Sequence, residues 1–251
     1  MRGVFFIVGP TSSGKSELAA DVAREVEAEI VSADAFQIYE GFPLLTAKPD
    51  AVTLAKAPHH LIGTMSILQE MSAQKFRRAA LAAIAQIHER GKRALVVGGS
   101  GLYVKALTHG LNDDWKKVEA ELPGVFVFRD RDALYARINA RVEAMLASGA
   151  IDEVRAAGAM SATAAKMMGL REIRSHLDSE MSISPQDESV RLADLQCVAK
   201  IQQATRQYAK RQLTWFRHQT NFEPLNLSLL THGEAVERIS QRAQSAFVEQ
   251  G

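Results

Sequence analysis

One segment constrains the fold more than any other part of the chain: Gly9-Pro10-Thr11-Ser12-Ser13-Gly14-Lys15-Ser16. It matches the pattern G-x-x-x-x-G-K-[ST], follows a short apolar run and opens an amphipathic helical pattern. In this context glycines let the backbone wrap an anion, loop amides point inward and the helix N-terminus adds positive potential. Lys15 supplies a full positive charge, and the Ser16 hydroxyl can bind Mg²⁺. The segment therefore predicts a site for a diphosphate or triphosphate, as in ATP-binding proteins.

Apolar runs and helical patterns alternate along the first 150 residues, which indicates parallel strands joined by crossover helices. We expect strands at Gly3 to Val8, Glu29 to Ser32, Ala94 to Val97 and Val125 to Phe128, and helices at Lys15 to Val26, Ser72 to Arg90 and Asp132 to Ala147. Beyond residue 150 we expect helices at Ile151 to Ala157, Gly169 to Leu177 and Glu188 to His218, and no strand. The pattern predicts an α/β fold, a P-loop NTPase-like parallel sheet with flanking helices and a helical C-terminal part.

These patterns divide the chain into three parts. Residues 1–149 form the expected P-loop α/β core, residues 150–221 a helical part packed on it, and residues 222–251 a weakly patterned tail that frays. The chain has 251 residues, 30 Lys and Arg against 29 Asp and Glu, and one cysteine, so it has no internal disulfide. Its apolar runs are far shorter than the roughly 20 residues of a membrane span. We expect a cytoplasmic, monomeric protein that makes no membrane contact.

An acidic residue, Asp34, follows the second expected strand. The carboxyl ends of parallel strands meet at one edge of a sheet, so Asp34 and Lys15 should share a crevice. A carboxylate there can act as a general base. It can equally cap a helix or lie in the outer shell of Mg²⁺. As a base it would suit a small-molecule kinase, which deprotonates a hydroxyl beside ATP, or an alkyl transferase, which deprotonates an amine beside a diphosphate leaving group.

A basic stretch without acidic residues runs from Gln196 to Phe222. Its basic residues are Lys200, Arg206, Lys210, Arg211 and Arg217, and its interleaved residues include Thr205, Tyr208, Trp215 and Phe216. Most such stretches are the solvated face of a helix whose aromatic residues pack inward. Arginine beside a phosphate loop can also clamp a diphosphate, and basic residues with aromatic neighbours suit an RNA strand.

Several segments together resemble the tRNA dimethylallyltransferase (tRNA isopentenyltransferase) family. They are the loop Gly9 to Ser16, Ser32-Ala33-Asp34-Ala35-Phe36-Gln37-Ile38-Tyr39, Thr46-Ala47-Lys48-Pro49, Ala57-Pro58-His59-His60, Phe76-Arg77-Arg78-Ala79, Gly98-Gly99-Ser100-Gly101-Leu102-Tyr103 and Thr205-Arg206-Gln207-Tyr208-Ala209-Lys210-Arg211-Gln212-Leu213-Thr214-Trp215. The loop alone is generic, whereas the whole set in this order is specific. The resemblance implies a prenyltransferase that moves a dimethylallyl group from dimethylallyl diphosphate to N6 of the adenine on the 3′ side of the tRNA anticodon.

The resemblance also implies roles for individual residues. Asp34 would be the general base and Arg206 a second diphosphate clamp, so that Asp34, Thr11 and Arg206 form the catalytic set. The diphosphate would be held by Gly9, Pro10, Thr11, Ser12, Ser13, Gly14, Lys15, Ser16 and Arg206, with Mg²⁺ at Ser16. The tRNA would meet Asp34, Ala35, Phe36, Gln37 and Ser100, the last at a position where the family usually has Thr.

The chain departs from the family in one place. The tRNA-acting members carry a helical module with an Arg-rich stretch before the strand that here is Val125 to Phe128. Only the segment His109 to Gly124 occupies that place, so the module is expected to be missing and RNA binding to be weakened. Adenylate isopentenyltransferases, which prenylate free AMP, are also short here and are the nearest competing interpretation. A P-loop kinase and a non-catalytic RNA-binding remnant are less favoured interpretations.

Overall fold

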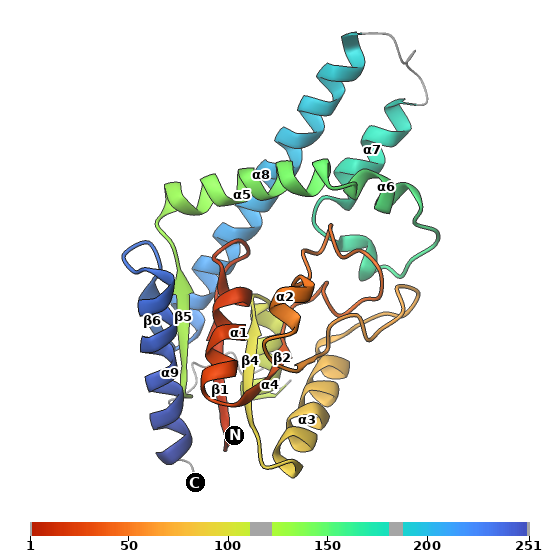
Figure 1. The fold of residues 1–251 in the computed structure, drawn as a ribbon. Helices are drawn as coiled ribbons and strands as arrows, with labels where there is room; N and C mark the ends of the chain where they lie inside the picture. Colours follow the sequence, from red (N-terminus) through yellow and green to blue (C-terminus); the bar gives the residue numbers. More distant parts are fainter. Residues whose placement is uncertain (1, 111–121, 181–187, 250–251) are drawn as a thin grey trace.

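A six-stranded sheet forms the centre of the computed structural model, which describes residues 2–110, 122–180 and 188–249 (Figure 1). The strands are β1 (Val4–Val8), β2 (Ala28–Ser32), β3 (His59–His60), β4 (Arg93–Gly98), β5 (Gly124–Phe128) and β6 (Glu223–Asn226). They lie in the order β3-β2-β4-β1-β5-β6, and every pair is parallel. All six strands therefore end at the same edge of the sheet.

Helices cover both faces of this sheet. They are α1 (Lys15–Glu25), α2 (Ala51–Leu54), α3 (Ala73–Glu89), α4 (Gly101–His109), α5 (Arg131–Ala147), α6 (Ala150–Arg155), α7 (Leu170–Glu180), α8 (Glu188–Gln219) and α9 (His232–Glu249), with a 3₁₀ turn at Ala164–Lys166. Among the helices that the structure describes, none is long and apolar enough to cross a membrane.

The side chains of β1 alternate between two cores, as expected for a buried strand. Phe5 and Ile7 pack into the core beneath α1 and α9, and the Phe5 ring meets Phe247 of α9 edge-on. Phe6 points to the opposite face, where it packs with residues of α3, α4 and α8. The strand is thus buried on both sides, which fixes the position of the loop that follows it.

Two long helices lie over the edge at which the strands end (Figure 1). Helix α5 runs across this edge, and α8 descends past it along the sheet. Leu134 and Ile138 of α5 pack with Ala209 of α8 in a small cluster of fully buried residues. This contact packs α5 against α8.

The expected α/β architecture is confirmed, but the C-terminal segment differs from its prediction. The sequence pattern predicts a fraying tail over residues 222–251 and no strand after residue 150. Instead, β6 extends the sheet beside β5, and α9 packs on α1. The division of the chain at residues 149 and 221 stays a prediction.

Candidate active site

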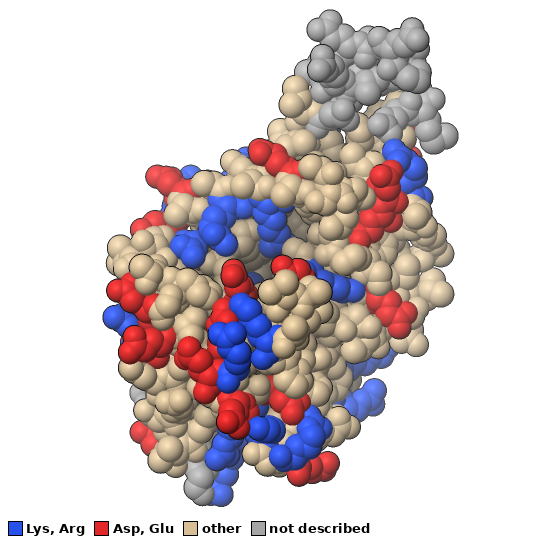
Figure 2. Space-filling view, viewed as in Figure 1, with Lys and Arg blue, Asp and Glu red and all other residues tan. Residues whose placement is uncertain are grey.

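A cavity of about 340 Å³ opens at the carboxyl edge of the sheet, below α5. Figure 2 shows a hollow at this place, bordered by both basic and acidic side chains. The walls come from the phosphate loop, from the segment after β2, and from α5 and α8. The lining includes Thr11, Ser12, Gly14, Lys15, Ser16, Asp34, Phe36, Gln37, Thr46, Lys48, Arg137, Arg141, Thr205 and Tyr208. The crevice expected from the sequence therefore exists, and it contains both Lys15 and Asp34.

Two arginines, one directly after β5 and one on α5, hold the outside of the phosphate loop. Arg129 Nε donates to the Ser13 carbonyl at 2.9 Å, and Arg137 Nε donates to the Ser12 carbonyl at 3.0 Å. Ser12 has a φ of 61°, a left-handed conformation that is unusual for a residue with a side chain. Holding these two carbonyls outward stabilises this backbone shape, which an anion-binding loop needs.

Gln212 of α8 ties the same loop to the neighbouring strand. Its Oε1 accepts from the Thr11 amide at 2.9 Å, and its Nε2 donates to the Gly99 carbonyl at 2.8 Å. The side chain is 6% exposed, so both bonds are shielded from water. Gln212 thereby places the basic helix against the phosphate loop, which connects the two motifs that are farthest apart in the sequence.

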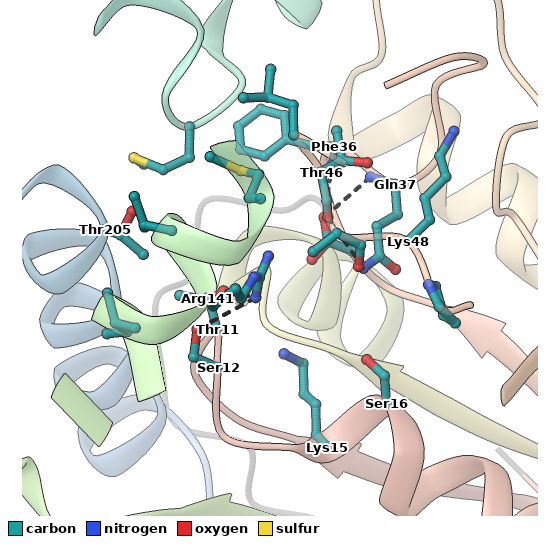
Figure 3. A pocket seen from close by; sticks show the side chains of 18 of the residues that line it. Thr11, Ser12, Lys15, Ser16, Phe36, Gln37, Thr46, Lys48, Arg141 and Thr205 are labelled. Atoms are coloured by element: carbon teal, nitrogen blue, oxygen red, sulfur yellow. Dashed lines mark hydrogen bonds between the residues drawn. The ribbon is translucent and has the colours of Figure 1, made fainter. Parts of the chain in front are cut away.

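Lys15 points into the cavity from the start of α1 (Figure 3). It is 8% exposed, and its Nζ donates to the Pro10 carbonyl at 3.2 Å. Burial lowers the pKa of Lys15 to about 8, an effect that the nearby negative charge of Asp34 partly opposes. No side chain caps the N-terminus of α1, where Gly14 has a left-handed conformation. The first-turn amides and Lys15 are thus available to an anion.

Asp34 lies across the cavity from the loop and shapes its own turn. Its Oδ1 accepts from the Phe36 amide at 2.9 Å and from the Gln37 amide at 3.2 Å. Gln37 in turn donates from Nε2 to the Ala47 carbonyl at 2.9 Å. Both bonds of the carboxylate use one oxygen, so its second oxygen can accept a proton without breaking the turn.

An apolar wall faces these polar groups. It consists of Leu45, Ile138, Val142, Met145, Met168 and Ile201, together with the ring of Tyr208. Burial, followed by the charge of Asp34, raises the pKa of the Tyr208 hydroxyl, so this group stays protonated at neutral pH. One cavity thus combines a cationic end, a carboxylate and an apolar wall, as a substrate with a charged head and a hydrocarbon tail requires.

Six predicted site residues lie outside the cavity lining, and two of them make side-chain contacts elsewhere. Arg206 donates from Nη1 to Asn139 Oδ1 at 2.7 Å and lies over the Tyr135 ring, one residue beyond Thr205 of the lining. Ser100 caps α4, its hydroxyl oxygen accepting from the Tyr103 amide at 3.4 Å. Gly9, Pro10, Ser13 and Ala35 also lie outside the lining, as supporting backbone. A family module is expected to be missing at His109 to Gly124, and residues 111–121 of that segment lie outside the described residues.

The sequence interpretation missed Arg137, Arg141 and Gln212. The two arginines are four residues apart on an expected helix, a spacing that places both on one face. That signal was present in the sequence, but nothing indicated that this face would meet the phosphate loop. Gln212 belongs to a segment of the family resemblance, yet its bonds depend on the contact between α8 and the loop.

The donors around Ser16 fit a hard cation such as Mg²⁺. The Ser16 hydroxyl and the Asp34 carboxylate line the same cavity, and oxygen atoms are the ligands that Mg²⁺ prefers. Across the described ranges, no group of three or more His, Cys, Asp or Glu side chains could hold a metal ion by itself.

The chain is similar in sequence to known prenyltransferases. Residues 37–125 and 117–219 match the family described as IPP transferase. The tRNA dimethylallyltransferase 1 of Citrifermentans bemidjiense is 36% identical over 281 aligned residues, which cover 85% of this chain and 88% of that protein. The tRNA dimethylallyltransferase of a Caulobacter species is also 36% identical, over 86% of this chain and 90% of its own length.

A solved structure shows the same fold. The tRNA isopentenylpyrophosphate transferase of Bacillus halodurans superposes with a TM-score of 0.83 and 25% sequence identity, and the match covers 98% of this chain and 97% of that one. The alignment to the Citrifermentans protein, at 281 positions, is longer than this 251-residue chain. That relative therefore has residues within the aligned stretch that this chain lacks.

Proposed function

Because this chain belongs to the tRNA dimethylallyltransferase (IPP transferase) family of prenyltransferases, we propose that it transfers the dimethylallyl group from dimethylallyl diphosphate to N6 of the adenine 3′ of the tRNA anticodon. The observation that carries the proposal is that Lys15 and the α1 N-terminus share a cavity with Asp34. The target adenine would leave the stacked anticodon loop to enter this cavity, as bases do in other base-modifying enzymes.

The cationic end of the cavity receives the leaving group. As the allylic C–O bond breaks, its electron pair goes to the ester oxygen that joined the carbon to the first phosphorus of the diphosphate. Lys15, the Thr11 hydroxyl and the first-turn amides of α1 stabilise the negative charge that develops there. Arg206 would add a further cation after its guanidinium leaves Asn139. These groups act in a mostly buried site, where electrostatic stabilisation is stronger than in water.

Asp34 accepts the proton at the other end of the reaction. The N6 lone pair is delocalised into the adenine ring, so the amine is a weak nucleophile and becomes acidic only as the N–C bond forms. The Asp34 carboxylate can then take the proton late in the step. Phe36 and Gln37 would contact the base beside this carboxylate, and Ser100 would contact the RNA outside the cavity.

Mg²⁺ would be held by the Ser16 hydroxyl, with its other ligands coming from water and from the diphosphate oxygens. When bound, the ion would neutralise charge on the diphosphate oxygens.

A labelled-donor assay tests the proposed acceptor. We expect purified protein and labelled dimethylallyl diphosphate to transfer label to tRNA and not to AMP. Label in AMP alone would assign the protein to the adenylate isopentenyltransferases. This second candidate is favoured by the residues that this chain lacks beside the Citrifermentans protein, because adenylate isopentenyltransferases are also shorter than the tRNA-acting members.

The rate should also depend on the protonation of Lys15. Its pKa is about 8 in the free protein, and only the protonated form attracts the diphosphate. We expect kcat/KM for dimethylallyl diphosphate to be level below pH 8 and to fall by up to about tenfold per pH unit above it. A pH series from 6 to 10 measures this. In Lys15→Arg the decline should move to higher pH, since guanidinium keeps its proton. A wild-type profile that stays level up to pH 10 would contradict the assignment.

A further inference from the structure

A turn beside the active site, residues 42–48, is held from outside by a carboxylate of α6. We call it the cavity turn, because four of its residues line the cavity: Leu45, Thr46, Ala47 and Lys48. We propose that Glu153 is a positioning residue that fixes the cavity turn and, through it, orients the side-chain oxygen of Gln37 toward the acceptor base. The identity of that base as adenine rests on the proposed function, whereas the fixing of the turn rests on contacts in the structure.

Glu153 binds the cavity turn with both oxygens of its carboxylate. Oε1 accepts from the Leu44 amide at 3.1 Å, and Oε2 accepts from the Leu45 amide at 2.8 Å. Hydrogen bonds to an ionised acceptor are among the stronger ones in proteins. The partners lie 109 and 108 positions away in the sequence, so this contact joins two regions that meet only in the folded chain.

The backbone of the cavity turn needs such support. Phe42 has a φ of 51° and Ala47 a φ of 46°, left-handed conformations that are unfavourable for residues with a side chain. Residues in such conformations persist where surrounding contacts hold them. The Thr46 hydroxyl supplies one contact from within the turn, since it donates to the Phe42 carbonyl at 2.7 Å. Glu153 supplies two more from outside.

Glu153 is itself held in place by the core. Two other residues of α6, Ala150 and Val154, are buried in the same hydrophobic cluster as the strands. The Glu153 amide donates to the Gly149 carbonyl at 3.0 Å, in the first turn of the helix. The carboxylate therefore reaches the cavity turn from a firmly packed helix.

The cavity turn sets the orientation of the Gln37 side chain. Gln37 Nε2 donates to the Ala47 carbonyl at 2.9 Å and is 3.5 Å from the Thr46 carbonyl oxygen (Figure 3). Carbonyl oxygens only accept, so the NH₂ group of the amide must face them. Gln37 lines the cavity, and among the described residues its Oε1 has no hydrogen-bond partner. This oxygen remains for a donor in the cavity.

An oxygen acceptor at this place suits the amine of adenine. N6 carries two hydrogens, of which the reaction removes one, to Asp34, and leaves the other. Gln37 Oε1 accepts from the N–H that stays, which fixes the amine relative to the allylic carbon. If the cavity turn shifted, the Gln37 amide would be free to rotate and to present its NH₂ group, a donor, to a donor amine.

A double-mutant cycle of Glu153→Gln and Gln37→Ala, measured as single-turnover prenyl transfer, tests this coupling. The amide of Glu153→Gln accepts from one backbone amide and places a donor against the other. We expect it to lower the rate at saturating substrates about 10- to 100-fold, the size of the loss when a reacting group is misplaced by about 1 Å. In the Gln37→Ala background the same change should lower the rate less than about threefold, because the group on which Glu153 acts is gone.

The matched control is Asp152→Asn. Asp152 precedes Glu153 on α6, its side chain is 77% exposed, and it pairs with Arg155 of the same helix. The change removes the same charge without touching the cavity turn, so transfer should stay within about twofold of the wild type, as for other surface substitutions.

Hydrogen exchange supplies a measurement that needs no substrate. The amides of Leu44 and Leu45 should exchange about tenfold faster in Glu153→Gln, because their hydrogen bonds open more often, and at the wild-type rate in Asp152→Asn. Glu153→Asp keeps the charge on a shorter side chain and should show the same faster exchange. It replaces Glu153→Gln in both experiments if that variant does not fold.

Two results would overturn the proposal. One is a loss of rate that is equal with and without the Gln37 side chain, which would make Glu153 a general structural support. The other is unchanged exchange of the Leu44 and Leu45 amides. Because tRNA and AMP offer the same adenine amine, the cycle uses whichever acceptor is prenylated. A wild-type protein that prenylates neither would refute the proposed function, while hydrogen exchange would still decide whether Glu153 fixes the turn.

Discussion

Replacing Asp34 with Asn should lower the rate of dimethylallyl transfer about 10²- to 10⁴-fold, the range for the loss of a general base. The amide keeps an oxygen that can accept from the Phe36 and Gln37 backbone, which Asp34 Oδ1 now does at 2.9 and 3.2 Å. The turn should therefore survive while the basic oxygen is lost. Single-turnover assays with saturating dimethylallyl diphosphate and tRNA would measure the effect on the chemical step.

Asp34→Ala supplies the comparison, because it removes the base and both turn contacts. It should lose at least as much activity as Asp34→Asn and also some stability, about 1–3 kcal/mol for the two amides left unpaired. Inorganic diphosphate should bind Asp34→Asn as well as the wild type or better, since a negative charge facing Lys15 has been removed. An Asp34→Asn protein that retains the wild-type single-turnover rate would show that another group takes the proton.

Replacing Gly98 with Ala should destabilise the protein by about 3 kcal/mol, at the upper end of the usual cost of overpacking. A Cβ on Gly98 would lie 2.2 Å from the Ala33 carbonyl oxygen and 2.4 Å from its carbon. That peptide cannot shift easily, because the Ala33 amide donates to the Val97 carbonyl at 2.7 Å and its oxygen accepts from the Ser100 amide at 3.3 Å. The ends of β2 and β4 would have to separate.

Thermal unfolding measures this effect, which should appear as a drop in Tm of about 10 °C for a chain of this size. The matched control is Gly233→Ala on α9, where an added Cβ meets nothing within 4 Å. That change should be neutral or raise stability by about 0.5–1 kcal/mol, because alanine favours a helix. If Gly98→Ala had the same Tm as Gly233→Ala, that result would contradict the close approach of the Ala33 carbonyl to Gly98. Activity should fall as well, since Ala33 immediately precedes Asp34.

The core elements could be predicted because their signals are local. The strands β1, β4 and β5 each contain an apolar run of four or five residues, and β2 is centred on Ile30 and Val31. Helix α3 begins after Ser72, whose hydroxyl accepts from the Lys75 amide at 3.2 Å. The predicted ends agree with the observed ones to within about two residues, the usual uncertainty at helix and strand ends.

The C-terminal elements were missed for two different reasons. Strand β6 has the sequence Glu-Pro-Leu-Asn, which has no strand pattern, and it forms because β5 offers an unpaired edge. The start of helix α9, in contrast, could have been predicted from the sequence. Glu234 Oε2 accepts from the Thr231 amide at 2.8 Å, and Thr231 Oγ1 accepts from the Glu234 amide at 3.3 Å. This is a capping box, the pattern T-x-x-E, and it was present in the sequence.

The sequence by itself determined the phosphate loop, the parallel sheet behind it and the family, because a motif of adjacent residues carries its own geometry. Only the tertiary structure decided which distant groups complete the site. Gln212 joins the loop to α8 across 201 positions of sequence, and Arg141 reaches Thr11 across 130. Arg206 lies against Asn139 instead of the loop. Such contacts depend on how α5 and α8 pack above the sheet, and no local pattern of residues encodes that packing.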